Sequence, residues 1–162
     1  MPPPPRISLK PGPEDLVDIV AGENHTCVRK YNKSVYCWGA SEVGQTGTTH
    51  TAPSCPGSNY CVNRPKLLTV WGTDGTRVPF TASQIDAGGM HNCAIDQNQD
   101  MNCWGEGNYT AAIGVFGNRF EPTKLNTPLK FVSVGAGGGS SCGNTTSGMY
   151  CWGEIAGAPL GP

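Results

Sequence analysis

The eight cysteines have the most reactive side chains of this protein, and they are separated by short, regular intervals along the sequence. Two pairs are ten positions apart, one is nine apart, and Trp-Gly follows the second cysteine of each of these pairs. A fourth pair closes the loop CPGSNYC. The pairs are Cys27 with Cys37, Cys93 with Cys103, Cys142 with Cys151, and Cys55 with Cys61. Cysteines at such distances could bind a metal ion, form a reactive pair or form disulfides.

Disulfides are the chemistry that this spacing favours. Zinc would need closely spaced ligands such as Cys-x-x-Cys, which the sequence lacks, and three near-equivalent pairs single out no redox centre. In a hairpin centred on Asn32, Cys27 and Cys37 stand directly opposite each other, near the Cβ separation of a disulfide. The same arithmetic holds for the second pair, whereas the third needs an even-numbered turn at Thr146-Ser147 or a bulge. We predict four local disulfides and therefore an oxidising compartment.

Four asparagines lie in Asn-x-Ser/Thr sequences, the acceptor pattern for N-linked glycans. We expect Asn32 and Asn144 to lie in hairpin loops, where a glycan disturbs no packing, and they are the preferred sites. Asn108 and Asn24 are the other candidates, and Asn24 lies near a turn. Glycans and disulfides together indicate an extracellular or cell-surface protein.

The elements that position these residues repeat three times. In each unit a short apolar strand ends in Ala-Gly, a second strand carries the first cysteine, and a third carries the second cysteine and Trp-Gly. Another strand is expected upstream of each Ala-Gly, at 6–9, 66–70 and 123–125, which makes four strands per unit. We divide the chain into a polyproline segment (1–5), repeat 1 (6–47), a disulfide-closed insertion (48–64), repeat 2 (65–114) and repeat 3 (115–162).

Composition supports a turn-rich all-β fold and excludes several functions. The 23 glycines and 14 prolines disfavour long helices, and units of about 50 residues suit propeller blades of four-stranded antiparallel sheets. The formal net charge of -1 provides no basic surface for nucleic acid. No apolar run approaches the roughly 20 residues of a membrane span. The start of the chain is not typical of a signal peptide, so any export signal would lie outside it.

The stretch VDIVAGENHTCVRKYNKSVYCWGASEVGQTG, residues 17–47, resembles a repeat of the regulator-of-chromosome-condensation type. The family pattern is a hydrophobic pair, Ala-Gly, His, a strand, Val-Tyr-x-Trp-Gly and Gly-Gln-x-Gly. The matching residues are Ile19-Val20, Ala21-Gly22, His25, Val35-Tyr36, Trp38-Gly39 and Gly44-Gln45-Thr46-Gly47. Repeat 2 has Ala112-Ile113-Gly114 in place of the Gly-Gln element, and repeat 3 has Ser140 in place of His.

This resemblance implies a β-propeller, but three repeats cannot close a ring, because propellers use about four to eight blades. An open arc would expose apolar blade faces to water, so we expect further repeats or further copies to complete the structure. The family's best-known activity is nucleotide exchange on a small nuclear GTPase. Paired cysteines and the lack of a matching exchange hairpin make a guanine-nucleotide exchange factor-like regulator the least favoured function. Other family members are binding modules that use the top surface and loops of the ring.

No group of residues predicts catalysis. His25 and His91 occupy the same repeat position, and Ser140 replaces them in repeat 3, which favours a structural role. The sequence GAGGGS at 135–140 is similar to a phosphate-binding loop, but a strand rather than a helix follows it. The acids at the repeat edges form no assignable acid–base pair: Asp18, Glu23, Asp86, Glu106 and Glu154. We expect no enzymatic activity and no bound cofactor or metal.

We therefore predict a non-enzymatic extracellular β-propeller module that binds a protein or a glycan or has an architectural role, with no nucleic-acid partner and no membrane span. The alternative is a self-assembling structural subunit, whose exposed blade faces pair with other copies to give a ring or a glycosylated filament. The mass of the chain in solution separates these two hypotheses.

Overall fold

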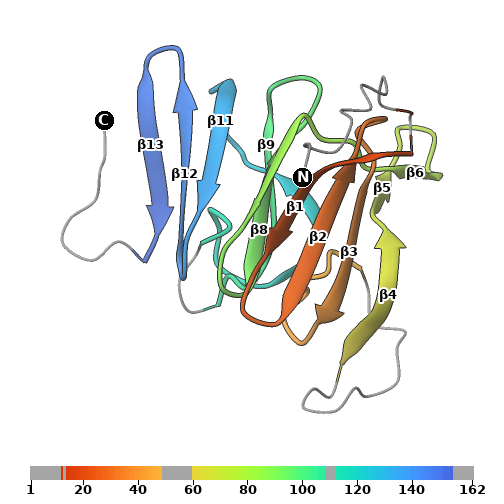
Figure 1. The fold of residues 1–162 in the computed structure, drawn as a ribbon. Helices are drawn as coiled ribbons and strands as arrows, with labels where there is room; N and C mark the ends of the chain where they lie inside the picture. The colour runs from red at the N-terminus through yellow and green to blue at the C-terminus, as the bar shows by residue number, and fades with distance from the viewer. Residues whose placement is uncertain (1–11, 13, 49–59, 109–111, 155–162) are drawn as a thin grey trace, which may run out of the picture.

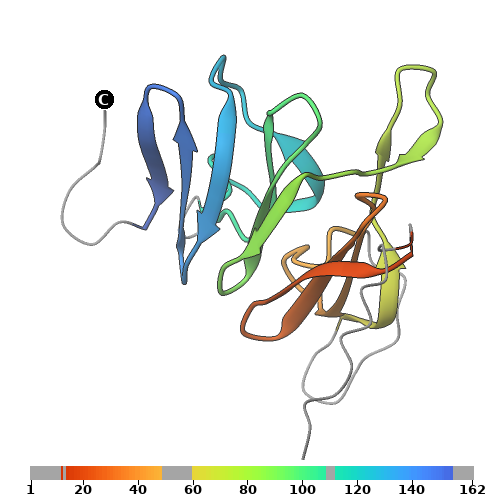
Figure 2. The ribbon, with the colours of Figure 1, turned by 45° about the horizontal axis from the view of Figure 1, so that its top comes forward.

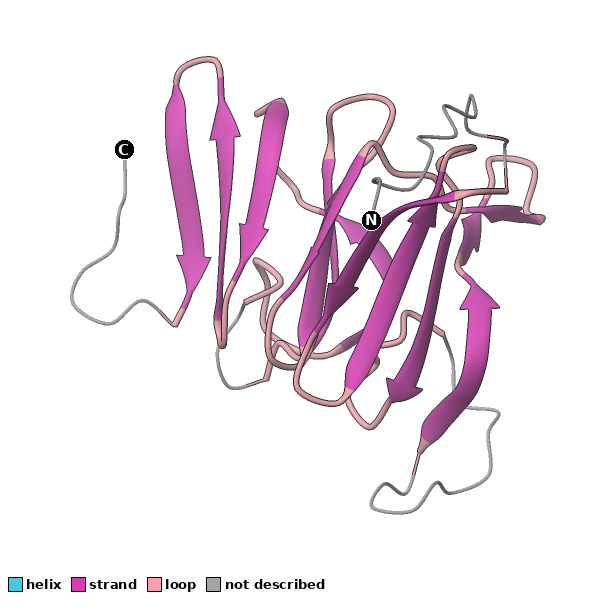
Figure 3. Ribbon diagram, viewed as in Figure 1, coloured by secondary structure: helices cyan, strands magenta, loops and turns pink. Residues whose placement is uncertain are grey.

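A computed structural model describes residues 12, 14–48, 60–108 and 112–154 of the chain. The described residues form thirteen β-strands and no helix (Figure 3). None of the described segments is therefore a helix that could cross a membrane. Short runs of alternating apolar and polar residues, interrupted by glycine-rich turns, explain this all-β structure.

Eleven of the described strands assemble into three antiparallel sheets, which we call blades 1, 2 and 3 (Figure 1). Blade 1 contains β1 (Leu16–Ala21), β2 (His25–Lys30), β3 (Val35–Ala40) and β4 (Cys61–Leu67), in that order. Blade 2 contains β7 (Gln84–Ala87), β8 (His91–Ile95), β9 (Met101–Gly105) and β10 (Arg119–Lys124). Blade 3 has three described strands, β11 (Phe131–Ala136), β12 (Ser140–Thr145) and β13 (Gly148–Gly153). The prediction of propeller blades built from antiparallel four-stranded sheets is confirmed.

The fourth strand of each complete blade comes from the residues upstream of the next Ala-Gly. β4 pairs with β3, and β10 pairs with β9. The sequence-based assignment of the upstream strands at 66–70 and 123–125 to the units that follow them is therefore wrong. The edge of β3 needs backbone hydrogen bonds, and the chain satisfies them by returning antiparallel along it. Consequently β4 begins at Cys61, within the expected insertion, and the expected strand at 6–9 lies outside the described residues.

The expected strand at 66–70 is divided in two. Leu68 is fully buried between β4 and β5 (Thr69–Trp71). β5 pairs with β6 (Arg77–Pro79) in a separate hairpin that projects away from the three blades (Figure 2). Trp71 belongs to a Trp-Gly pair that, unlike the others, does not directly follow a cysteine. It is 65% exposed on this hairpin, and the guanidinium of Arg77 stacks on its ring.

Two kinds of hairpin turn set the register of the cysteines. Lys33 and Gln99 adopt positive φ angles of 71° and 63°, which close the odd-numbered turns of blades 1 and 2. In blade 3, Thr145 pairs with Gly148, so that Thr146 and Ser147 form a two-residue turn. The predicted hairpin geometry is therefore confirmed in all three blades.

The blades pack against one another through two different faces. We call the side that carries the cysteine pair the disulfide face, and the opposite side, which carries the Trp of Trp-Gly, the Trp face. The disulfide face of blade 1 packs on Ile85, Ala94 and Trp104 in the Trp face of blade 2. The disulfide face of blade 2 packs in the same way on Val134 and Trp152 of blade 3. The first strands β1, β7 and β11 contact one another in chain order.

Candidate functional site

The Ala-Gly turns of the three blades meet in a structure that we call the glycine rim, residues 22–24, 88–90 and 137–139. Backbone hydrogen bonds join its members from blade to blade. The N–H of Glu23 donates to the carbonyl of Gly89 over 2.9 Å, and the N–H of Gly89 donates to the carbonyl of Gly138 over 2.9 Å. The rim therefore fixes the positions of the Ala-Gly turns of consecutive blades relative to one another.

Glycine is required in this rim because the blades approach through their backbones. A Cβ atom added to Gly22 would lie 2.5 Å from the Gly88 carbonyl oxygen. A Cβ atom on Gly88 would lie 2.2 Å from the Gly137 carbonyl oxygen and 2.1 Å from Cε1 of His91. Neither approach leaves space for any other residue type.

The two repeated histidines cross from one blade to the next. His25 donates from Nε2 to Oδ1 of Asn92 over 3.0 Å, and Nδ2 of Asn92 donates to the Gln45 carbonyl over 2.7 Å. His91 lies 2.8 Å from Oγ of Ser141. These bonds agree with the structural role expected for the repeated histidine position.

The tautomer of His91 follows from its partners. Ser141 has one hydroxyl proton, which it donates to the Ala112 carbonyl over 2.8 Å. Its oxygen must therefore accept the hydrogen bond of His91, so Nε2 of His91 carries the proton. Sequence reasoning did not identify the partners Asn92 and Ser141. The signal for them is that a small polar residue directly precedes the first cysteine in each repeat, at Thr26, Asn92 and Ser141.

Burial keeps both histidines neutral. His25 is 3% exposed and His91 is 1% exposed. Desolvation lowers the pKa of His25, and its hydrogen bond to Asn92 opposes this shift. Desolvation, assisted by the nearby His25, lowers the pKa of His91 to about 4, against the opposing charges of Glu106 and Asp86.

Acid is therefore expected to weaken the contact between blades 2 and 3. The folded-state pKa of His91 lies below its ordinary value of 6.5, so protonation favours the unfolded chain. The contribution of neutral His91 to the free energy of unfolding is therefore fully present above pH 6.5. As the pH drops toward 4 this contribution is lost, at about 1.4 kcal/mol per pH unit and about 3 kcal/mol in all. Urea unfolding at pH 7 and pH 4.5 measures this loss. The His91→Gln variant should be less stable at pH 7 but should lose much less on acidification, and an equal acid loss in both proteins would contradict the assignment.

The outer surface of the glycine rim is an open hollow of about 340 Å³, formed mainly by small residues. Its lining residues are Ala21, Gly22, Glu23, Ala87, Gly88, Gly89, Gly137 and Gly138. The carboxylate of Glu23 lies over Gly89, and the neighbouring Met90 is 41% exposed. The described residues contain no cluster of His, Cys, Asp and Glu that could hold a metal ion. This surface presents the Glu23 carboxylate, the flexible apolar side chain of Met90 and backbone polar groups. Such a combination is suited to contact with another macromolecule.

Three of the four predicted disulfides are present. They join Cys27 to Cys37, Cys93 to Cys103, and Cys142 to Cys151. The members of each pair lie directly opposite each other in neighbouring strands. Cys61 is also disulfide-bonded, but its predicted partner Cys55 lies outside the described residues.

The four candidate glycosylation asparagines are all exposed. Asn32 lies in the predicted hairpin turn, where its Oδ1 accepts hydrogen bonds from the N–H and hydroxyl of Ser34. The predicted placement of Asn144 in a loop is wrong, because it lies in β12, paired with Met149, and donates to Oγ of Ser133. The loop is shorter than expected because two residues suffice for the turn. Asn24 lies in the glycine rim and Asn108 follows β9, and glycosylation at all four sites stays a prediction.

One segment of the chain matches a known repeat family. Residues 16–45 match the family model of the regulator of chromosome condensation (RCC1) repeat. The chain is 27% identical over 158 residues to a bifunctional serine/threonine-protein kinase/NEDD4-like E3 ubiquitin-protein ligase of Dictyostelium discoideum. This match covers 90% of the chain but 8% of that relative.

Solved structures show the same blade arrangement. Prp20p of Saccharomyces cerevisiae, described with its binding properties to Gsp1p and histones, is 26% identical, with a TM-score of 0.65. This likeness covers 85% of the chain and 33% of Prp20p. The ectodomain of the Physcomitrella patens receptor kinase CR4 is 19% identical with a TM-score of 0.54, covering 91% of the chain and 34% of that protein. The chain thus spans about a third of the length of these solved structures.

Proposed function

We propose that this chain, which is built from RCC1-type β-propeller repeats, is a non-enzymatic extracellular module that binds another protein through its glycine rim. The observation that carries the proposal is the rim itself. Its backbone hydrogen bonds join the three turns in one surface, in which Glu23 and Met90 are exposed. The histidines nearest to this surface are already engaged in bonds between blades.

An extracellular location is supported by the covalent chemistry of the chain. Three disulfides, each within one blade, persist in oxidising compartments and are rare in reducing ones. Four exposed asparagines in acceptor sequences are compatible with passage through a secretory pathway. The similar fold of a receptor-kinase ectodomain supplies a precedent for this fold outside a cell.

Protein binding is supported by the yeast relative, which is described with binding properties to Gsp1p and histones. The experiment is an array of extracellular proteins and glycans, probed with the purified oxidised chain. We expect a protein ligand whose affinity falls about tenfold or more in the Met90→Asp variant, since an apolar anchor would become a charge. Val78→Asp is the control, because Val78 is also an exposed apolar residue, at 38%, but lies on β6, outside the rim. Binding that is confined to glycans, or that both variants retain, would contradict the proposal.

The second candidate function is that of a self-assembling structural subunit of a ring or filament. A specific observation favours it, because apolar side chains are exposed on the outward faces of blades 1 and 3. Met149, on the disulfide face of blade 3, is 57% exposed. Ile19 on the Trp face of blade 1 is 71% exposed, whereas its equivalent in blade 2, Ile85, is 7% exposed. Sedimentation analysis tests this function directly, since a chain that remains at 17.0 kDa at every concentration does not assemble.

A further inference from the structure

The described part of the chain contains two examples of the same blade-to-blade contact. In each, the disulfide face of one blade covers the Trp face of the next. The exposed Ile19 and the buried Ile85 occupy one repeat position, two residues before the alanine of Ala-Gly, and they differ in whether a preceding blade covers them. The surface around Ile19 on the Trp face of blade 1 therefore corresponds to a surface that the preceding blade covers in blade 2.

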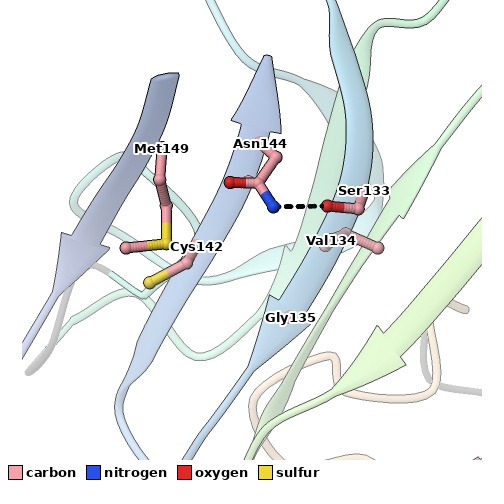
Figure 4. A pocket seen from close by; sticks show the side chains of 7 residues that line it. Ser133, Val134, Gly135, Cys142, Asn144 and Met149 are labelled. Atoms are coloured by element: carbon pink, nitrogen blue, oxygen red, sulfur yellow. Dashed lines mark hydrogen bonds between the residues drawn. The ribbon is translucent and has the colours of Figure 1, made fainter. Parts of the chain in front are cut away.

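The opposite end of the described chain presents the complementary surface. The four cysteines of the disulfides in blades 1 and 2 are at most 1% exposed, whereas Cys142 and Cys151 are only partly buried. Beside Cys142 lies a hollow of about 210 Å³ between β11, β12 and β13, into which Met149 and Asn144 also face (Figure 4). The corresponding place in blade 1, against the Cys27–Cys37 disulfide, is filled by the Trp face of blade 2.

Gly137 provides an independent indication that the disulfide face of blade 3 accepts another blade. At the equivalent positions Gly22 and Gly88, a Cβ atom would collide with a carbonyl oxygen of the next blade. At Gly137, the nearest described atom to an added Cβ would be Oγ of Ser140, at 3.6 Å. The repeat thus places a glycine where the described chain leaves space for a side chain. A following blade that approached Gly137 as blade 2 approaches Gly22 would require that glycine.

We propose that the disulfide face of blade 3 binds the Trp face of blade 1 in a second copy of this chain, in the register of the two contacts within the chain. This inference rests on the second of the two proposed functions. In that register Ile19 of the second copy covers the Cys142–Cys151 disulfide, and the N–H of Gly138 donates to the carbonyl of Glu23 of the second copy. The contact thereby repeats, between two copies, the arrangement that joins the described blades within one copy.

The new contact lacks the buried histidine of the internal contacts. Ser140 occupies the histidine position in blade 3, and Thr26 occupies the position of Asn92 and Ser141 in blade 1. A serine side chain is too short to span the distance that His25 and His91 span. Association between copies is therefore expected to be weaker than the contacts between blades of one copy, and to depend on concentration.

Sedimentation of the oxidised chain, with N-glycans removed, tests the proposal, because a sugar on Asn144 would cover the docking face. We expect the mass to rise with concentration from 17.0 kDa to about twice that value or more. Ile19→Asp and Gly137→Ala should each weaken association at least tenfold without lowering the Tm of the monomer, since both positions are open in one copy. Val78→Asp, at a 38% exposed position on β6, is the matched control for Ile19→Asp.

Mixing the two variants separates this proposal from self-assembly in general. Ile19→Asp keeps an intact blade 3 face, and Gly137→Ala keeps an intact blade 1 face. A mixture should therefore form a 1:1 complex through one native contact, although neither variant associates alone. If the parent chain assembles but the mixture does not, or if the variants assemble normally, the inference is wrong and self-assembly stands. If the parent chain remains a monomer, both fail.

Discussion

Reduction of the disulfides is expected to unfold this protein at neutral pH without denaturant. Each hairpin bridge closes a loop of about ten residues, for which the chain-entropy model gives about 2–3 kcal/mol. The three described bridges together contribute roughly 6–9 kcal/mol, comparable with the roughly 5–15 kcal/mol total stability of a typical domain. Circular dichroism during titration with dithiothreitol should show loss of the β-sheet spectrum. A chain that remains folded with all thiols free would contradict this expectation.

The order of reduction should follow access to the sulfur atoms. The Cys142–Cys151 bridge is partly exposed, whereas the bridges of blades 1 and 2 are buried between blades. Peptide mapping after brief reduction should therefore find Cys142 and Cys151 modified first. The double variant Cys142→Ala/Cys151→Ala is the control, and it should lose about 2–3 kcal/mol while unfolding cooperatively. Equal rates of modification at all three bridges would show that the blades do not protect them.

Replacement of Trp104 by alanine is expected to lower the free energy of unfolding by about 3–5 kcal/mol. The Trp104 side chain is fully buried against the disulfide face of blade 1, and its ring contacts the edge of Phe80 with the centroids 5.8 Å apart. Removing it leaves a cavity at the centre of the contact between blades 1 and 2, which the paired backbones cannot close. Urea unfolding of the oxidised chain measures the loss.

Trp38→Ala provides the matched comparison for Trp104→Ala. Trp38 occupies the same repeat position, but it lies half-buried on the uncovered Trp face of blade 1. Its removal should cost about 1–2 kcal/mol when measured in dilute solution, where copies of the chain are separate. Equal losses at the two positions would mean that the local sheet, rather than the neighbouring blade, determines the contribution of this tryptophan.

The positions of the histidines predict different acid sensitivity for the blade contacts within one copy and for the proposed contact between copies. A buried histidine bridges each contact within the described chain, and such a contact weakens in acid. The proposed contact between copies has Ser140 in place of the histidine, so acid should affect it less. The ring or filament would then be opened by dilution, whereas the blades within one copy would be loosened by acid.

Local sequence is sufficient to predict the hairpins and their cross-links. Opposed residues in a hairpin are related by counting from the centre of the turn, because side chains alternate with a period of two. This relation places Cys27 opposite Cys37 and indicates the two-residue turn at Thr146-Ser147, and both features are present in the fold. The threefold repetition of Ala-Gly, cysteine and Trp-Gly is likewise sufficient for the blade type. The hairpins and their bridges depend on residues within about ten positions of one another.

Only the tertiary structure decided which partner each blade surface and each sheet edge would meet. β4 joins the preceding blade, and Asn144 lies on a strand rather than in a loop. His25 bonds to Asn92, which is 67 positions away. Ile19 and Ile85 occupy the same repeat position before Ala-Gly, yet one is exposed and the other is buried. The physical reason is that burial and long-range hydrogen bonds depend on which blade stands alongside, and the sequence of one hairpin carries no information about its neighbour.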